Sequence, residues 1–301
     1  MRNLILTGIQ RYFRRPLTYI CLVASLFSGV MYAISSVYTD AETPSFHPDD
    51  FSWIISIFVN IVLLVLNIGT EFSAGAFRNK LIAGYSKQNL YLSETVLALL
   101  LSSVMFCLTA LPFAVCRFEY LSKMNNLPLA FGSIFAAYVF IGILPVLFCF
   151  VSANRTAAAI FSLLLTFGLY FTSYSLEHKL NAPEYYTIYY YADGSSMHVT
   201  YGDFDAEDMN DVTEVKKEPN PDYIGGTKRT VLTFLNDCNS FTAIRSFSVY
   251  GYYTNNFMTN ELPAYEEENR PQTQRALVST CMAGAVLTTV GAWIFKKKNL
   301  R

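Results

Sequence analysis

Six long apolar stretches dominate the pattern of hydrophobic and polar positions along the chain. They cover residues 17–39, 51–70, 90–115, 129–152, 157–175 and 276–295. Because a helix rises about 1.5 Å per residue, about 20 residues cross a hydrocarbon core of about 30 Å. Apolar helices in soluble cores are shorter, and the alternating segments of a membrane β-barrel are absent from the sequence. The pattern therefore predicts six transmembrane helices.

The charged residues strengthen this prediction. They make up 15% of the 301 residues, against about 25% in an average soluble protein. Glu94 is the single charge within the six stretches. The first stretch is longer than the apolar region of a signal peptide, so we expect it to be a true span. The predicted fold class is an all-α polytopic membrane protein.

The distribution of Lys and Arg predicts the orientation. Twelve of the 22 basic residues lie in four segments that alternate with the spans. These segments are 1–16, 71–89, 153–156 and 296–301. The short loops on the other side hold only Arg117 and Lys123. By the positive-inside rule, both termini are expected in the cytoplasm and the 100-residue loop 176–275 outside.

The outer segment 176–275 has the pattern of a small α+β domain. Tyr185–Ala192 and Ser196–Tyr201 flank an Asp-Gly dipeptide, which is typical of a β-hairpin. The acidic run 203–222 indicates a solvated loop. Two short helices are predicted after it, over Thr227–Asn236 and Phe241–Val249. The expected order is thus an interfacial segment, five spans, this domain, and a sixth span with a basic tail over 276–301.

Two further short helices are predicted on the cytoplasmic side. Residues 2–15 place apolar side chains near helical spacing and end in arginines, which fits either an amphipathic interfacial helix or a charged flank of the first span. In the loop after the second span, Phe77, Leu81 and Ile82 are expected to share one face. Such a helix could dock a soluble partner, or it could lie on the membrane surface without one.

Ion-coupled transport is disfavoured by the lack of ionisable residues in the spans. A transporter of that kind usually holds such groups near the middle of the membrane. Glu94 lies near the inner end of the third stretch. It is expected either to reach the interface as a snorkelling or capping residue, or to act in gating or in a hydrogen bond between helices.

Catalytic and metal-binding motifs are equally scarce. The sequence has no His-Glu-x-x-His, Cys-x-x-Cys or Gly-x-Ser-x-Gly motif and no Gly-x4-Gly-Lys-Ser/Thr phosphate loop. We therefore expect neither enzymatic activity nor a metal or cofactor in this chain, and nothing indicates nucleic-acid binding. Cys116 and Cys238, both on the predicted outer side, could form a disulfide or stay reduced.

Three segments resemble the permeases of ABC-2 type transporters, the membrane subunits of ATP-binding cassette exporters, in their Firmicutes-type form. The first segment is Glu71-Phe-Ser-Ala-Gly75-Ala-Phe77-Arg78-Asn79-Lys80-Leu81-Ile-Ala-Gly84-Tyr-Ser-Lys87. It is similar to the family's acid-x3-Gly-Thr-x-Arg-Asn-Lys-Leu segment, with Ala76 in place of Thr. The second is the outer stretch Asn220–Asp237, and the third is the apolar and basic tail Gly291–Arg301.

The resemblance implies a function and a set of partners. Residues 71–86 would form the coupling helix on a separate ATPase subunit that binds ATP and Mg²⁺, and residues 1–16 would hold the interfacial connecting helix. A second permease copy would complete a homo- or heterodimer within the lipids of a bacterial cytoplasmic membrane. The residues implied in ATPase coupling are Glu71, Gly75, Phe77, Arg78, Asn79, Lys80, Leu81 and Gly84.

The cargo and one rival function stay open at this point. Apolar spans and an acidic, aromatic outer face suit an amphipathic or peptide-like substrate, and antimicrobial-peptide export or resistance is one hypothesis. The alternative class is a membrane sensor or receptor whose extracellular domain binds a ligand.

Overall fold

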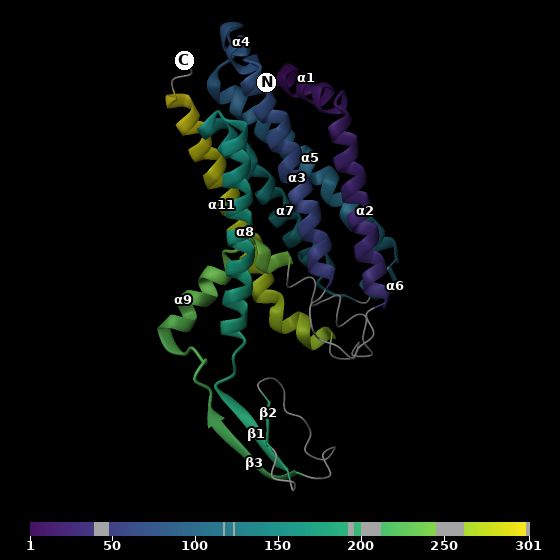
Figure 1. Cartoon of the computed structure of the whole chain (residues 1–301), viewed down its shortest axis with the longest axis vertical. Helices are drawn as coiled ribbons and strands as arrows, with labels where there is room; N and C mark the ends of the chain where they lie inside the picture. The colour runs from purple at the N-terminus through teal and green to yellow at the C-terminus, as the bar shows by residue number, and fades with distance from the viewer. Residues whose placement is uncertain are drawn as a thin grey trace. The chain divides into compact units, whose positions relative to one another are not determined.

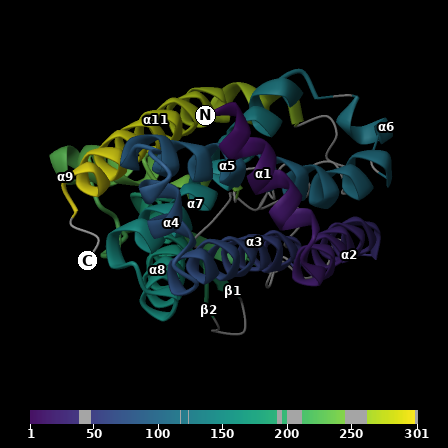
Figure 2. The same ribbon diagram turned by 90° about the horizontal axis from the view of Figure 1, so that it is seen from above.

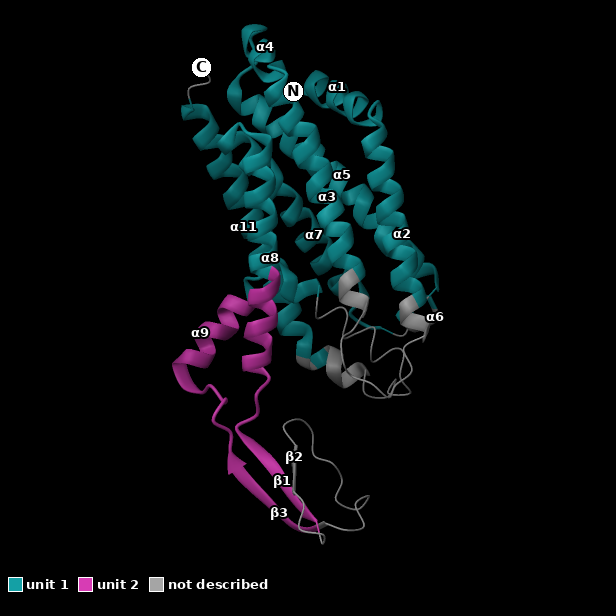
Figure 3. Ribbon diagram, in the orientation of Figure 1, with its two compact units in different colours: residues 1–169, 237–301 teal, residues 170–236 magenta. Residues whose placement is uncertain are grey.

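The computed structural model describes residues 1–38, 48–116, 118–122, 124–191, 196–199, 212–244 and 262–298. It is mostly helical, with one small sheet (Figure 1). The chain divides into two compact units (Figure 3). Unit 1 comprises residues 1–169 and 237–301, and unit 2 comprises residues 170–236.

Six helices in the described part of the chain are long and apolar enough to cross a membrane. They are α2 (Pro16–Tyr38), α3 (Pro48–Ser73), α5 (Lys87–Cys116), α7 (Leu127–Ser152), α8 (Arg155–Leu180) and α11 (Leu262–Lys297). Each coincides with one predicted apolar stretch, so the prediction of six helices of membrane-spanning length and composition is confirmed. Helix α11 begins 14 residues before the predicted stretch, because its Glu-rich start continues the same helix.

The bundle of unit 1 is organised around α5 and α7. Helix α5 contacts α1, α2, α3, α7 and α11, while α7 contacts α3, α5 and α11. The view from above shows α5 and α7 between α11 and α3 (Figure 2). Large side chains fill this centre, among them Trp53, Tyr32 and Tyr138, which are fully buried.

Helices α2 and α5 approach each other closely at Gly29. A Cβ atom at this position would meet the backbone oxygen and Cα of Thr109. Small residues permit such contacts between membrane helices, where dispersion and hydrogen bonds replace the hydrophobic effect.

A row of polar residues runs along the buried face of α3. Its members are Ser52, Ser56, Asn60, Asn67 and Glu71, at intervals of four or seven residues. These intervals place them on one side of a helix, because 3.6 residues make one turn. Helix α3 therefore turns a polar ridge into the bundle instead of toward lipid.

Hydrogen bonds to neighbouring helices satisfy the middle of this ridge. The Ser56 hydroxyl lies 2.6 Å from the Thr109 hydroxyl and 2.7 Å from the Tyr138 hydroxyl. The Asn60 amide donates to the Ser102 hydroxyl over 2.9 Å. Such bonds link α3 to α5 and α7 and fix how the three helices are rotated against each other.

Short helices lie at the end of the bundle where the described chain begins and ends (Figure 1). They are α1 (Arg2–Phe13) and α4 (Ala76–Ile82). Helix α1 confirms that this segment is helical, and it buries Leu4, Gly8 and Tyr12, one residue per turn. At the opposite end of the bundle, α6 (Phe118–Leu121) is a single turn.

Unit 2 contains a three-stranded antiparallel sheet in the order β2-β1-β3. Strands β1 (Tyr185–Tyr191) and β2 (Ser196–Val199) form the predicted hairpin, with Thr187 opposite Val199. Helix α9 (Gly226–Asp237) confirms the first predicted outer helix. The second begins within the described residues, where 240–244 are helical, and its predicted remainder lies outside them.

The prediction of a continuous loop over 203–222 is wrong in its second half. Strand β3 (Val212–Pro219) occupies this part and pairs with β1 along its length. Valine and threonine in the strand favour an extended chain, and β1 offers an edge for its backbone groups. The high charge of the segment concealed this pairing, and residues 200–211 lie outside the described part.

Unit 2 covers residues 170–236, whereas the outer domain was predicted over residues 176–275. Helix α8 continues to Leu180, and residues from Asp237 onward group with unit 1. Asp237 is held there by Arg275 of α11, whose Nε donates to the carboxylate over 2.5 Å, and by the Ser279 hydroxyl, which donates to its backbone oxygen. Burial raises the pKa of Asp237, and Arg275 opposes this shift.

Candidate functional site

Four charged side chains from four helices meet beside the α1 and α4 end of the bundle. Arg11 of α1 donates to both carboxylate oxygens of Glu94 on α5, over 2.8 and 3.1 Å, and also pairs with Glu71 of α3. Lys80 of α4 donates to Glu71 over 2.6 Å and lies 3.9 Å from Glu94. We refer to these four residues as the charge cluster.

The charge cluster is compensated and largely shielded from solvent. The exposed fraction of the side chain is 3% for Glu94, 9% for Glu71, 14% for Arg11 and 25% for Lys80. Burial by itself lowers the pKa of Arg11, but Glu94 and the other neighbouring charges raise it more, so the guanidinium stays charged. Two cations thus neutralise two anions where a single charge would be costly.

A group of aromatic rings packs against the same face of α4 as the charge cluster, where Lys80 lies 4.9 Å from the centre of the Phe77 ring. Phe77 packs against Phe72 and Phe150, with ring centroids 4.4 and 5.0 Å apart. Phe150 of α7 also contacts Tyr91 of α5 and Phe295 of α11 at 5.2 and 4.6 Å. Through this aromatic group and the charge cluster, a helix of seven residues contacts α3, α5 and α7, and Glu71 links it to Arg11 of α1.

Glycines define both ends of α4. Gly75 has φ of 69° and Gly84 has φ of 90°, in the left-handed region that side chains with a Cβ rarely adopt. A Cβ atom built at either position would contact no other atom. Glycine is therefore required by the backbone conformation and not by close packing. The two turns allow α4 to lie between α3 and α5 as a separate element.

The outward face of α4 is exposed. Arg78, Asn79 and Ile82 are exposed, and so are Gly84 and Tyr85 after the helix. Within the described chain, the guanidinium of Arg78 makes no hydrogen bond or ion pair. This surface is therefore available to another molecule.

The structure corrects two sequence-based expectations. Ile82 does not share the buried face with Phe77, since 76% of it is exposed while Phe77 is buried and Leu81 half-buried. The five residues between Phe77 and Ile82 turn the helix by about 500°, which carries Ile82 well away from Phe77. Glu94 is not a snorkelling or capping residue, because its carboxylate is buried and bonded to Arg11 of another helix.

Sequence reasoning found three members of the charge cluster and missed the fourth. Glu71, Lys80 and Glu94 were singled out, and the structure brings them together. From the sequence, Arg11 is only one of the arginines at the end of segment 2–15, whether that segment is an amphipathic helix or a charged flank of the first span. The sequence offers one indication that a fourth residue is needed. Two acids at the edges of apolar stretches need two cations, and Lys80 is only one.

The tail after α11 closes the same end of the bundle. Lys298 donates to the carbonyl oxygens of Phe150 and Val151 at the end of α7, over 3.1 and 2.6 Å. Lys87 at the start of α5 donates to the carbonyl oxygen of Lys298 over 2.6 Å. Burial lowers the pKa of Lys298.

The described residues contain no group of three or more His, Cys, Asp or Glu side chains that could hold a metal ion. Cys116 and Cys238, the two candidates for a disulfide, are both free thiols. Comparisons with protein-family models, with curated proteins and with solved structures find no match to this chain. The functional argument therefore rests on the charge cluster, the aromatic group and the exposed face of α4.

Proposed function

We propose that this chain is the membrane subunit of an ATP-driven exporter of the ABC-2 type. The observation that carries the proposal is the way α4 is built. It is a short helix between two spans, exposed on one face and bonded on the other to the helices of the bundle. A soluble ATPase seated on the exposed face could move α4 and thereby the bundle.

The contacts of α4 offer two routes for such a movement. The ion pair between Lys80 and Glu71 couples a movement of α4 to α3. Arg11 pairs with both Glu71 and Glu94, and this couples α3 to α5. Phe77 couples the movement of α4 to α7 through Phe150. Because packed interiors shift between discrete arrangements, a displacement of α4 can change which side of the membrane the bundle opens to.

The proposed topology places both termini and α4 in the cytoplasm of a bacterial cell, with unit 2 outside. A second permease copy, identical or related, would complete the pathway, and ATP and Mg²⁺ would bind to the ATPase subunits. Glu94 serves in this scheme as a gating residue through its bond to Arg11.

The exposed face of α4 provides the test. Arg78→Glu combined with Ile82→Asp changes only exposed side chains and leaves Lys80 and Phe77 in place. We expect these changes to abolish co-purification of an ATPase bearing a phosphate-binding loop, and with it ATP-dependent transport in inside-out vesicles. Lys228→Glu, an exposed change on α9, is the matched control and keeps both. Unchanged association and transport in the α4 variant would contradict the proposal.

The proposed cargo is an amphipathic or peptide-like molecule moved outward. Spans almost free of charge suit such a molecule, and the acidic and aromatic outer segment suits a cationic peptide. Unchanged susceptibility to cationic antimicrobial peptides after deletion of the gene would argue against a role in peptide resistance.

Unit 2 favours a second candidate, a membrane sensor whose external domain binds a ligand. Residues 170–236 form a compact unit with its own sheet, as a ligand-binding domain would. A sensor needs no ATPase, so the co-purification experiment separates the two candidates.

A further inference from the structure

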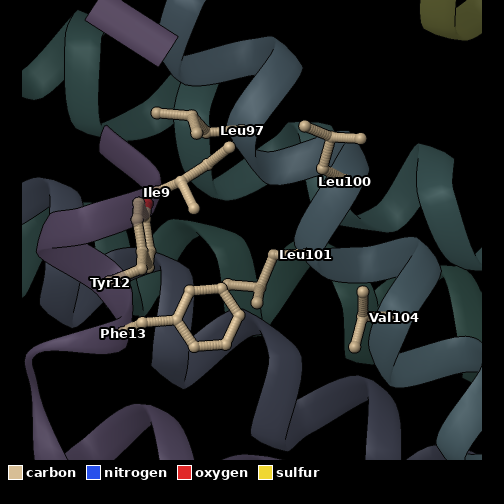
Figure 4. A pocket seen from close by; sticks show the side chains of 7 residues that line it. All are labelled: Ile9, Tyr12, Phe13, Leu97, Leu100, Leu101 and Val104. Atoms are coloured by element: carbon tan, nitrogen blue, oxygen red, sulfur yellow. The ribbon is translucent and has the colours of Figure 1, made fainter. Parts of the chain in front are cut away.

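An apolar cavity of about 200 Å³ lies between α1 and α5, outside the charge cluster. Its lining comes from Ile9, Tyr12 and Phe13 of α1 and from Leu97, Leu100, Leu101 and Val104 of α5 (Figure 4). None of these residues has a part in the proposed docking of an ATPase.

The cavity has a buried floor and an open rim. Tyr12, Leu97 and Leu101 are buried, whereas Leu100 and Val104 are 48% and 44% exposed. Since α5 is one of the six membrane-spanning helices, the rim faces hydrocarbon and not water. The molecules next to the open side of this cavity are therefore lipids.

The cavity is shorter than one leaflet. Its lining on α5 runs from Leu97 to Val104, which is about 10 Å at about 1.5 Å per residue. Half of a hydrocarbon core is about 15 Å deep, so the cavity can hold part of one acyl chain of the leaflet next to α1.

The residue that follows the α1 part of the lining is positively charged. Arg14 comes directly after Phe13 and is exposed, and its guanidinium has no hydrogen bond or ion pair within the described chain. Glu71 and Glu94 are already paired with Arg11 and Lys80. Arg14 is thus an exposed cation, without a carboxylate partner, that is available to a lipid phosphate.

Tyr12 contributes its aromatic ring to the wall of the cavity, while its hydroxyl oxygen is inaccessible from outside the protein. The wall is therefore apolar at this point, as an acyl chain requires.

We propose that this cavity binds part of one acyl chain of an anionic phospholipid, whose phosphate is held by Arg14. The lipid completes the contact of α1 with α5 and so supports the placement of Arg11 in the charge cluster. This proposal depends on the membrane-spanning bundle and not on an ATPase partner.

Lipid retention by the purified full-length chain tests the proposal. The protein is taken from nanodiscs that hold equal amounts of phosphatidylglycerol and phosphatidylcholine, and bound lipid is counted by native mass spectrometry. We expect one retained phosphatidylglycerol per chain. Arg14→Gln should reduce the preference for phosphatidylglycerol about fivefold, which corresponds to roughly 1 kcal/mol for one basic residue near anionic lipid.

Leu100→Trp fills the rim of the cavity and should abolish retention. Leu100 is half exposed, so the larger side chain can be accommodated without unfolding, and an unchanged elution profile checks this. The matched controls are Leu164→Trp on the exposed face of α8 and Arg78→Gln on α4, both of which should retain the lipid.

Three results would overturn the proposal. Equal retention of the two phospholipids by the native chain would indicate an adventitious lipid only. Equal loss in the control variants, or full retention in Leu100→Trp, would show that the lipid binds elsewhere. Each result is independent of ATPase association, because Arg14 and Leu100 lie outside the exposed face of α4.

Discussion

At the scale of single residues, the candidate site is held together mainly by the pairing of opposite charges in an apolar environment. Arg11 and Lys80 are held close to Glu71 and Glu94 because each ion would otherwise lose its hydration without a partner. Removing one member leaves the other three with an uncompensated net charge in a buried site, which costs far more than losing a surface pair.

Glu94→Gln tests this difference. The amide has nearly the shape of the carboxylate but no charge, so the charge cluster gains a net positive charge. We expect the free energy of unfolding in detergent to fall by about 3 kcal/mol, measured as a lower midpoint of thermal unfolding.

The matched control is the exposed pair of Lys216 and Glu218 in strand β3, whose atoms lie 2.8 Å apart. Lys216→Gln should leave the thermal midpoint unchanged, because solvent screens this pair. Equal changes in the thermal midpoint for Glu94→Gln and Lys216→Gln would show that the charge cluster stabilises the fold no more than an exposed ion pair does.

At the scale of elements, close approach between helices matters as much as their hydrophobicity. Helix α4 illustrates the point, because seven residues are too few for a stable isolated helix in water. Phe77, Lys80 and the turns at Gly75 and Gly84 hold it in place. Helices α2 and α5 likewise depend on the absence of a side chain at Gly29.

Gly29→Ala should therefore separate α2 from α5. The added methyl group would meet backbone atoms of Thr109, which cannot rotate away as a side chain can. We expect a loss of about 1 to 3 kcal/mol in the free energy of unfolding, measured by thermal unfolding in detergent.

Gly168→Ala on α8 is the control for this change. No atom lies within 4 Å of a Cβ atom at that position, and alanine has the higher helix propensity, so stability should stay equal or rise slightly. A Gly29→Ala variant as stable as the native chain would contradict the close contact.

At the scale of the whole molecule, the proposed topology has six spans with both ends of the chain on one side of a membrane. The excess of Lys and Arg next to the termini and α4 predicts that this side is the cytoplasm. The orientation can be tested without knowledge of the cargo or of the ATPase.

Single cysteines introduced into a cysteine-free variant test the orientation. Tyr85→Cys lies just after α4, and Asp222→Cys lies in unit 2, both at exposed positions. We expect a membrane-impermeant maleimide to label Asp222→Cys in intact cells and Tyr85→Cys only after permeabilisation. The reverse pattern would invert the proposed topology and remove α4 from the reach of a cytoplasmic ATPase.

Hydrophobic patterning and motif resemblance were enough to predict the six apolar helices, the hairpin and three of the four members of the charge cluster. Hydrophobic length predicts a membrane helix because an unpaired backbone is not tolerated in lipid, whatever the helix packs against. The resemblance of residues 71–87 to a transporter segment likewise singled out Glu71 and Lys80 without any knowledge of their partners.

Only the tertiary structure decided which of these residues meet. Arg11 lies 83 positions from Glu94, and its role depends on how α1 folds back against α5. Strand β3 was hidden for the same reason, because its pairing depends on the free edge of β1. The local sequence determines the secondary structure of a segment. The partner of a buried charge or of a strand edge comes from a distant part of the chain and depends on the tertiary fold.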